Sequence, residues 1–252
     1  MPLTFAHPAA ILPLSRKHKY INFSAMVLGS MAPDFEYFLR GRPMGEIGHT
    51  FAGFVYFNLP LVAVIYFIYH SFVHQTLFNH LPVFLQDAST NRVESSNQLK
   101  VVVFIYSALF GMLTHVVWDS FTHINGYMVL RFPALFTNTY NIYGFDIPLY
   151  KFLQHGSTVV GIALIVGYLY VRALLYRQKN TTESTQRKLR FWTSLFLLIA
   201  VIVCFWYMID YIPILNYGIA VVRIIDSFLL SLLVVSLFYK KHLKDCGEAV
   251  EE

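Results

Sequence analysis

The chain has 252 residues, of which 56% are hydrophobic and only 13% are charged, and its mean hydropathy is +0.53. This composition excludes an ordinary soluble domain of that length and predicts an integral membrane protein surrounded by the lipid bilayer. The net charge of +5 is not concentrated in a dense basic run, so we exclude nucleic acid as a partner and expect the basic residues to set the orientation in the membrane.

The N-terminal region, residues 1–50, contains two apolar stretches that prolines interrupt. The first stretch, 3–14, contains Pro8 and Pro13 and is predicted to be an interfacial or re-entrant piece. The second, 21–39, is a weaker candidate for a transmembrane span, because one proline and two acidic residues interrupt it.

Five further segments are long enough and apolar enough to span a bilayer. They are 51–74, 100–121, 155–176, 190–210 and 215–238. Together with 21–39 they predict an all-α, polytopic membrane helical bundle of about six transmembrane helices, which forms a single domain over residues 1–252. The sequence sets no oligomeric state.

Two polar segments, the loop 178–190 and the tail 240–252, are rich in Lys and Arg. Two predicted spans separate them, so both lie on one side of the membrane, and the positive-inside rule places that side in the cytoplasm. With six spans the N- and C-termini are then cytoplasmic, whereas the connections 40–50 and 122–154 lie on the outer side.

The most informative motif, residues 114–123, ends the apolar segment 100–121 and contains His115 and Asp119. These residues are four apart and share one face of a helix. A carboxylate and imidazoles are costly there unless they pair, line a water-filled cavity or bind a metal, and H-x-x-x-D is a reasonable half-site for zinc or another divalent ion. The alternative is a buried hydrogen bond that fixes helix packing. His123 is either a further ligand or an interfacial residue.

Other polar residues fall on the same predicted side of the membrane. Pro33 disfavours helix at the preceding residue, and a break there would direct Asp34 into a site; alternatively, Pro33 and Asp34 simply begin a helix. His49 and His155 each precede a span, where a histidine is either a ligand or an interfacial residue. Because residues at a shared depth can converge in a bundle, we expect a His/Asp cluster near the outer interface.

Three other polar groups are harder to place. The six-span topology puts His7 on the cytoplasmic side, and it can join the cluster only if the first forty residues fold as a re-entrant or interfacial unit on the outer side. His70 and His74, four apart at the end of the second span, are interpreted as interfacial. Arg223 and Asp226, three apart in the last span, are expected to neutralise each other, or else to mark a polar pathway in a transporter.

The first 125 residues contain several distinctive motifs. They include PLTFAHPAA at 2–10, GSMAPDFEYF at 29–38 and GHT at 48–50. These stretches resemble a bacterial family described as domain of unknown function 4184. More distantly, the order of His, Pro-Asp, His-Thr and His-x-x-x-Asp is similar to the YdjM-like membrane-bound metal-dependent hydrolases and to the zinc-dependent phospholipase C pattern.

The resemblance implies a protein of the bacterial cytoplasmic membrane that holds a divalent metal, zinc or alternatively manganese. Its central ligands would be Asp34, His49, His115 and Asp119. His7 would complete a second ion through Asp119, and His123 and His155 are candidates for the remaining position. The paired H-x-x-x-E of these relatives is missing, since Val159 follows His155 by four residues, so one or two ions are expected instead of three.

The predicted His/Asp cluster and the family resemblance together favour a metal-dependent hydrolase that acts on a phosphoester or similar bond in a lipid or envelope substrate. Glu36 is the candidate catalytic residue that orients or deprotonates water. Asp34 and Glu36 are two apart, so only an irregular backbone at Pro33 could point both inward. The alternative is a non-enzymatic membrane protein, a small transporter or an assembly factor, in which the His/Asp cluster is structural or relays protons.

Overall fold

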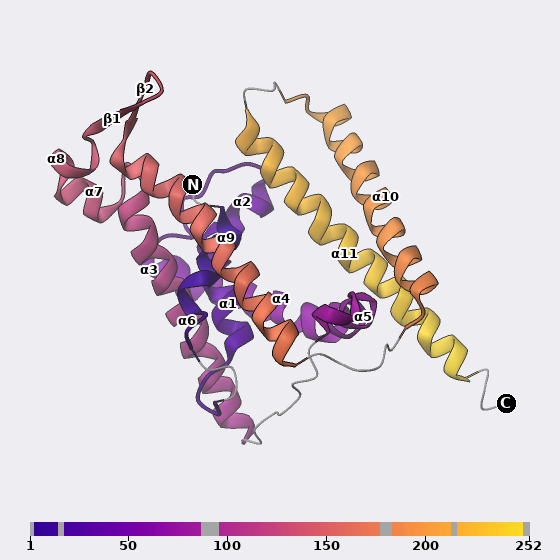
Figure 1. The fold of residues 1–252 in the computed structure, drawn as a ribbon. Coiled ribbons are helices and arrows are strands. Elements are labelled where there is room, and N and C mark those ends of the chain that lie inside the picture. The colour runs from indigo at the N-terminus through magenta and orange to yellow at the C-terminus, as the bar shows by residue number, and fades with distance from the viewer. Residues whose placement is uncertain (1–2, 15–17, 87–95, 177–182, 213–215, 249–252) are drawn as a thin grey trace. The chain divides into compact units, whose positions relative to one another are not determined.

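The computed structural model describes residues 3–14, 18–86, 96–176, 183–212 and 216–248 (Figure 1). Helices dominate this part of the chain, and its sheet consists of two strands, so the predicted all-α class is confirmed. Five helices in these ranges are long enough and apolar enough to cross a membrane. They are Phe51–His80, Asn97–Thr122, Leu149–Leu175, Thr185–Ile209 and Tyr217–Lys240.

The first of these runs is a succession of shorter helical pieces. They are α3 (Phe51–Gly53), the π-helical η3 (Phe54–Asn58), α4 (Leu59–Ile68), the π-helical η4 (Tyr69–Val73) and α5 (His74–His80). A 3₁₀ turn, η5 (Val83–Leu85), follows. The other four spans are single helices, α6 (Asn97–Thr122), α9 (Leu149–Leu175), α10 (Thr185–Ile209) and α11 (Tyr217–Glu248).

Several helix ends differ from the sequence-based boundaries. α9 begins at Leu149 instead of 155, and α10 begins at Thr185, so the non-helical part of the predicted loop 178–190 is shorter than expected. Ser184 caps α10, because its hydroxyl accepts a hydrogen bond from the Arg187 N–H. Most of the predicted polar tail is helical, since α11 continues to Glu248. Residues 177–182 and 249–252 lie outside the described part of the chain.

The predicted sixth span, 21–39, is not one long helix. It contains α1 (Phe23–Met31), the 3₁₀ turn η2 (Ala32–Asp34) and the short α2 (Phe35–Arg40). Pro33 lies in η2 and has no N–H to continue the α-helical ladder. The nine residues of α1 extend about 14 Å, roughly half of the hydrocarbon core of a bilayer. The predicted count of six spans is therefore not confirmed.

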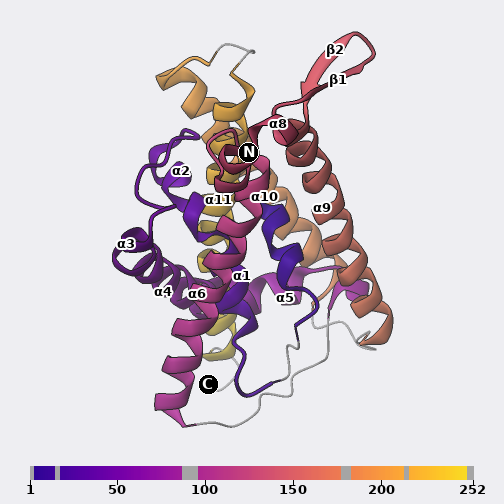
Figure 2. The ribbon, with the colours of Figure 1, turned by 90° about the vertical axis from the view of Figure 1, so that its left-hand side faces the viewer.

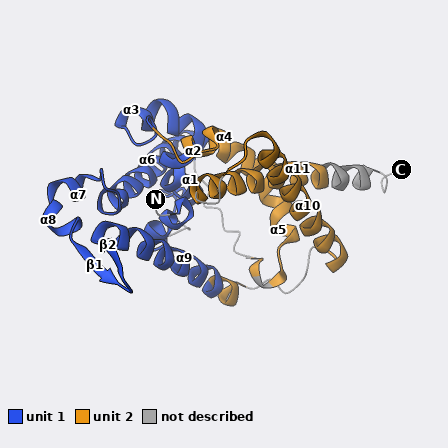
Figure 3. Cartoon of the chain, turned by 90° about the horizontal axis from the view of Figure 1, so that it is seen from above, with its two compact units in different colours: residues 1–35, 46–63, 90–171 blue, residues 36–45, 64–89, 172–252 orange. Residues whose placement is uncertain are grey.

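The chain divides into two compact units (Figure 3). The first unit comprises residues 1–35, 46–63 and 90–171, and the second comprises 36–45, 64–89 and 172–252. The cluster of predicted metal ligands belongs to the first unit, whereas α10 and α11 belong to the second.

Within the first unit, α1 lies directly against α6 (Figure 2). A Cβ atom on Gly29 would stand 2.2 Å from the carbonyl oxygen of Ala108, and one on Gly111 would stand 2.3 Å from the carbonyl oxygen of Met26. Only glycine fits at two such positions, so the two backbones approach as closely as small residues permit.

The N-terminal segment η1 (Thr4–Ile11) folds back onto the same unit. The backbone N–H of Leu3 donates a hydrogen bond of 3.2 Å to Oγ1 of Thr158 on α9. Farther along the chain, the N–H of Asn22 donates to Oγ of Ser107, near the middle of α6, and α1 then returns along α6 to its C-terminal end. The η1 segment therefore packs against the first unit, and the prediction that 3–14 is an interfacial or re-entrant piece stays a prediction.

The second unit packs α5, α10 and η4 against α11. Its apolar core consists of Val73, Phe191, Leu195, Leu232 and Val235. Close to it, the indole N–H of Trp192 donates a hydrogen bond of 3.0 Å to the carbonyl oxygen of His80, where α5 ends. The packing thus joins the C-terminal pair of helices to the end of the first span.

The predicted pairing of Arg223 with Asp226 is wrong. In the described part of the chain the guanidinium of Arg223 forms its ion pair with the carboxylate of Asp210 and donates a hydrogen bond of 2.9 Å to the Asp210 carbonyl oxygen. It also lies 4.6 Å from the ring centre of Trp206. The Arg223 guanidinium holds the pKa of Asp210 below its usual range. Packing of α10 against α11 supplies this partner, which spacing along one helix cannot reveal.

The connection between α6 and α9, residues 123–148, contains elements that the sequence reading did not predict. They are α7 (Tyr127–Arg131), α8 (Pro133–Phe136) and the hairpin strands β1 (Thr139–Ile142) and β2 (Phe145–Pro148). The turn residues Tyr143 and Gly144 have φ values of 51° and 85°, the positive values that a two-residue hairpin turn requires.

Candidate metal centre

Asp34, at the end of η2, is fixed from one side by Thr4 of η1. The Thr4 hydroxyl donates a hydrogen bond of 2.6 Å to Oδ2 of Asp34. Asp34 is only 1% exposed, and its Oδ1 has no hydrogen-bond partner among the described residues. One carboxylate oxygen is thus held by the fold, and the other is available to a ligand.

His49 lies in the turn that precedes α3, and hydrogen bonds hold that turn in place. The Gly53 N–H donates to Oγ1 of Thr50 at 2.9 Å, which caps the helix, and the Asn58 amide donates to the carbonyl oxygen of Gly48 at 2.6 Å. The His49 side chain is 31% exposed, so it is the most accessible member of the cluster.

His115 and Asp119 lie on one face of α6, as the four-residue spacing predicts. His115 is fully buried, and its Nδ1 lies 2.8 Å from the carbonyl oxygen of Ser30 on α1. A carbonyl oxygen only accepts hydrogen bonds, so Nδ1 carries a proton, and in the neutral imidazole Nε2 then presents a lone pair. This arrangement, with one nitrogen bound to a carbonyl, is the one that orients metal-ligating histidines.

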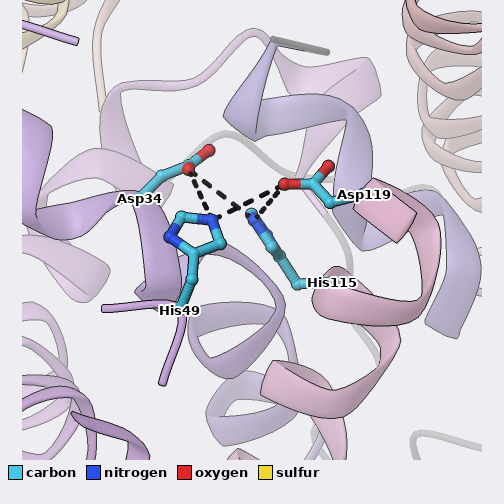
Figure 4. Close-up of side chains that lie close together, drawn as sticks. All are labelled: Asp34, His49, His115 and Asp119. Carbon is cyan, nitrogen blue, oxygen red and sulfur yellow. Dashed lines mark ion pairs between the residues drawn. The ribbon is translucent and has the colours of Figure 1, made fainter. Parts of the chain in front are cut away.

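Four side-chain atoms from these three regions converge on one point (Figure 4). Nε2 of His49 lies 3.6 Å from both Asp34 Oδ1 and Asp119 Oδ2. Nε2 of His115 lies 3.6 Å from Asp34 Oδ1 and 3.2 Å from Asp119 Oδ2. In a tetrahedral zinc site with bonds of about 2.1 Å, ligand atoms stand about 3.4 Å apart. The four donors therefore have the chemistry and the spacing to hold a divalent ion.

The charge of the cluster also favours a bound cation. Asp34 and Asp119 are both buried, and the ion-pair partners of both carboxylates among the described residues are histidines. Burial raises the pKa of Asp34, because the charged carboxylate has lost its water. Two buried carboxylates without Lys or Arg are compensated most directly by a cation between them.

His7 lies on the other side of Asp119. Its Nε2 stands 3.6 Å from Oδ1 of Asp119, and its ring stacks on that of His115 with the centres 3.8 Å apart. His7 is 1% exposed, and neither ring nitrogen has a hydrogen-bond partner among the described residues. Burial, assisted by the neighbouring His115, lowers the pKa of His7 to about 3. The six-span topology had placed His7 on the opposite side, whereas in the structure η1 packs against α6 and brings His7 beside Asp119.

His123 also contacts Asp119, through Nδ1 at 3.4 Å from Oδ1 and at 3.3 Å from the Asp119 carbonyl oxygen. Because the carbonyl oxygen can only accept, this contact favours a proton on Nδ1. His123 is thereby suited to donating a hydrogen bond that orients Asp119.

Two of the predicted site residues are not part of this group. His155 lies in the second turn of α9, with an exposed side chain and outside the cluster of four. Glu36 belongs to the second unit, where its carboxylate forms an ion pair of 2.7 Å with Arg40.

Sequence reasoning missed Thr4 and Ser30, which hold Asp34 and His115. Neither residue has a spacing signal, because both contacts join segments that are distant in the sequence. Thr4 lies inside the PLTFAHPAA motif that contains His7, and Ser30 lies inside the GSMAPDFEYF motif that contains Asp34; membership of these motifs is the clue that the sequence offers.

Comparisons with known proteins agree with the first of the resemblances. The family model described as domain of unknown function (DUF4184) matches residues 1–237. No curated protein and no solved structure matches the chain. The more distant similarity to metal-dependent hydrolases is not shown by these comparisons. Since the family model covers nearly the whole sequence, the chain belongs to the DUF4184 family.

Proposed function

We propose that this protein is a membrane-bound, metal-dependent hydrolase that acts on a phosphoester or similar bond in a lipid or envelope substrate. The observation that carries the proposal is the convergence of two imidazole nitrogens and two carboxylate oxygens, all within 4.8 Å of one another, at one end of a candidate membrane span. Zinc suits this mixed donor set, and manganese is the alternative.

In this proposal Asp34, His49, His115 and Asp119 would hold the ion, and His7 together with Asp119 would help to hold a second one. A bound divalent ion supplies a water molecule of near-neutral pKa and polarises the scissile oxygen. Four protein donors fill a tetrahedral shell, so catalysis requires a further open position. Substrate would approach past His49, the cluster member with the largest exposed fraction.

Glu36 remains the proposed proton acceptor, and its contact with Arg40 sets a condition on that role. The carboxylate must exchange its ion pair with Arg40 for a proton during the reaction.

We further propose that the site faces the outer side of the cytoplasmic membrane. Basic residues at the start of α10 and at the end of the last span favour the cytoplasm for those ends. Five spans would then place the C-terminus in the cytoplasm and the N-terminal segment, with His7, on the outer side. This topology replaces the cytoplasmic N-terminus that six spans would require.

The test combines metal content and turnover on the same purified variants. The protein is stripped with a chelator, reconstituted with zinc or manganese, and assayed on a phosphodiester, a phosphomonoester and a phospholipid. Turnover that depends on metal and disappears in His115→Ala, but not in the neighbouring control Thr114→Val, supports the proposal. Bound metal without turnover on any of these substrates would leave a structural metal site instead of an enzyme.

The role of Glu36 is tested by comparing its variant with a variant of its ion-pair partner, Arg40. We expect Glu36→Gln to abolish turnover with metal retained, because the amide keeps the shape and loses the base. Arg40→Gln removes the same ion pair and leaves the carboxylate, so turnover should persist. Equal losses in both variants would show that the pair is structural and that the proton acceptor lies elsewhere.

A proton relay is the second candidate function. The observation that favours it is the stacking of His7 on His115, which gives a continuous row of ionisable groups with Asp34 and Asp119. A protein that binds no divalent metal, but loses its cellular role when His7 is replaced, would favour the relay over the hydrolase.

A further inference from the structure

The connection between α6 and α9, residues 123–148, exposes a concentration of aromatic side chains. Tyr127 and Phe145 are each 72% exposed, Tyr143 is 98% exposed, and Phe132 and Tyr140 are exposed by about half. Arg131 and Asp146 are its only Lys, Arg, Asp or Glu residues. Such a surface needs an explanation, because large apolar patches in water usually mark a contact with a membrane or another molecule.

The hairpin of this connection has one apolar and one polar face. Tyr140 pairs with Ile147, and Ile142 pairs with Phe145, so these four side chains share one face. Thr139, Asn141, Asp146 and Pro148 share the other. On this second face the Asn141 amide donates a hydrogen bond of 2.9 Å to Oδ1 of Asp146. The alternation is that of a strand pair with one face in water and the other against an apolar layer.

An isolated two-stranded hairpin is marginally stable in water. In both views of the ribbon this hairpin projects from the start of α9, and within the described residues its strands pair with each other and with no third strand (Figure 1, Figure 2). Its apolar face therefore gains stability only if something outside the hairpin covers it.

The place of the connection in the chain indicates what covers it. It begins after Thr122, the last residue of one candidate span, and ends before Leu149, the first residue of another, so both of its ends are tethered at one surface of the bilayer. Phe121 and Phe152, which flank it on the spans, are also exposed. Exposed aromatic side chains are thus present both on the connection and on the adjoining ends of α6 and α9, where a membrane protein carries its interfacial belt of Tyr and Trp.

We propose that residues 123–148 form an interfacial anchor that rests in the lipid headgroup layer. The apolar face of the hairpin, with Tyr140 and Phe145, turns toward the lipid, and the polar face, with Asn141 and Asp146, turns toward water. This anchor requires neither a metal nor catalysis, so its test does not depend on the proposed hydrolase activity.

Adjacent residues of β1 provide a matched test. Single cysteines are introduced as Tyr140→Cys and Asn141→Cys in the full chain with Cys204 and Cys246 replaced by serine. Each is labelled with an environment-sensitive fluorophore, and the protein is reconstituted in phospholipid nanodiscs. Quenching is measured with iodide in the water and with a lipid that carries a nitroxide close to its headgroup. Phe145→Cys and Asp146→Cys repeat the comparison on β2 should a variant of β1 fail to fold.

The anchor predicts that the lipid nitroxide quenches labels at 140 and 145 several-fold more strongly than labels at 141 and 146, with the reverse order for iodide. Equal and strong iodide quenching at all four positions would place the hairpin in water and overturn the proposal. Protection of 140 and 145 from both quenchers would also overturn it, because a protein surface, such as a second copy of the chain, would then cover the apolar face.

Discussion

The two units bury ionisable side chains in apolar surroundings, but they compensate the charge in different ways. In the second unit Arg223 has a carboxylate partner in Asp210, a carbonyl acceptor and the ring of Trp206 beside it. In the first unit Asp34 and Asp119 contact only histidines and one hydroxyl among the ion pairs and side-chain hydrogen bonds of the described residues.

This difference separates a structural polar cluster from a candidate binding site. The positive charge of Arg223 is matched by the carboxylate of Asp210 from its own unit. The second unit still leaves Arg223 Nε and Asp226 Oδ2 without hydrogen-bond partners among the described residues, but these atoms do not form a group of His and Asp ligand atoms. The first unit has two carboxylates and leaves Asp34 Oδ1 and His115 Nε2 without hydrogen-bond partners in the described part of the chain. Unmatched charge and unused donor atoms that point at one another are what a cation site provides before its ion is added.

The largest effect on metal binding is expected from removing the Asp119 carboxylate, which lies close to both His49 and His115. We expect Asp119→Asn to weaken metal binding by more than about 100-fold, since even the loss of an outer-shell partner costs 10–100-fold. Asp226→Asn, which changes an aspartate of the second unit, is the matched control and should retain metal. Metal titration of both chelator-treated variants makes the measurement, and equal affinities would refute the assigned ligand.

Closer packing of α1 against α6 should disturb the site indirectly. Gly29→Ala places a Cβ 2.2 Å from the Ala108 carbonyl oxygen, which should destabilise the fold by about 1–3 kcal/mol and displace Ser30 from His115. Gly167→Ala, on α9, meets nothing within 4 Å and is the control. Thermal unfolding and metal content are measured together; an unaltered melting temperature in Gly29→Ala would mean that the helices do not approach this closely.

A smaller effect is expected from the hydroxyl that holds Asp34. Thr4→Val removes the 2.6 Å hydrogen bond and keeps the side-chain shape, so metal affinity should fall by about 10-fold. Thr114→Val is the control, because the Thr114 hydroxyl donates to the Gly111 carbonyl oxygen of its own helix. Competition with a fluorescent chelator resolves a difference of this size, and identical affinities in both variants would remove Thr4 from the site.

The least effect on metal is expected from the second unit. Arg223→Met takes the cation from the Trp206 ring and leaves the Asp210 carboxylate with Arg42 alone, at 3.4 Å, so the melting temperature should fall while metal content stays that of wild type. Loss of metal in Arg223→Met, at a temperature where the variant remains folded, would show that metal binding depends on Arg223 and would contradict the account.

Local periodicity explains which parts of the site could be predicted from the sequence. His115 and Asp119 follow from helical spacing, and Asp34 and His49 follow from their shared depth near span ends. His7 could not be placed, because its position depends on how η1 and α1 pack against α6. That packing rests on backbone contacts at Gly29 and Gly111, which hydrophobic patterns do not record.

The fold shows the same limit. Hydropathy predicted the five long helices, because burial in lipid acts on every residue of a span. It failed at Arg223, whose partner is on the neighbouring helix, and at the hairpin, whose turn residues Tyr143 and Gly144 lack the usual Asn-Gly signal. In both cases contacts between different segments of the chain determine the structure.

The central claim is that the four donors of the first unit hold a divalent ion, and metal analysis of the purified wild-type protein tests it most directly. We expect about one or two equivalents of zinc or manganese, with an X-ray absorption spectrum of nitrogen and oxygen ligands that includes imidazole and lacks sulfur. Wild-type protein that is purified without metal, and that takes up none on titration at neutral pH, would contradict the account.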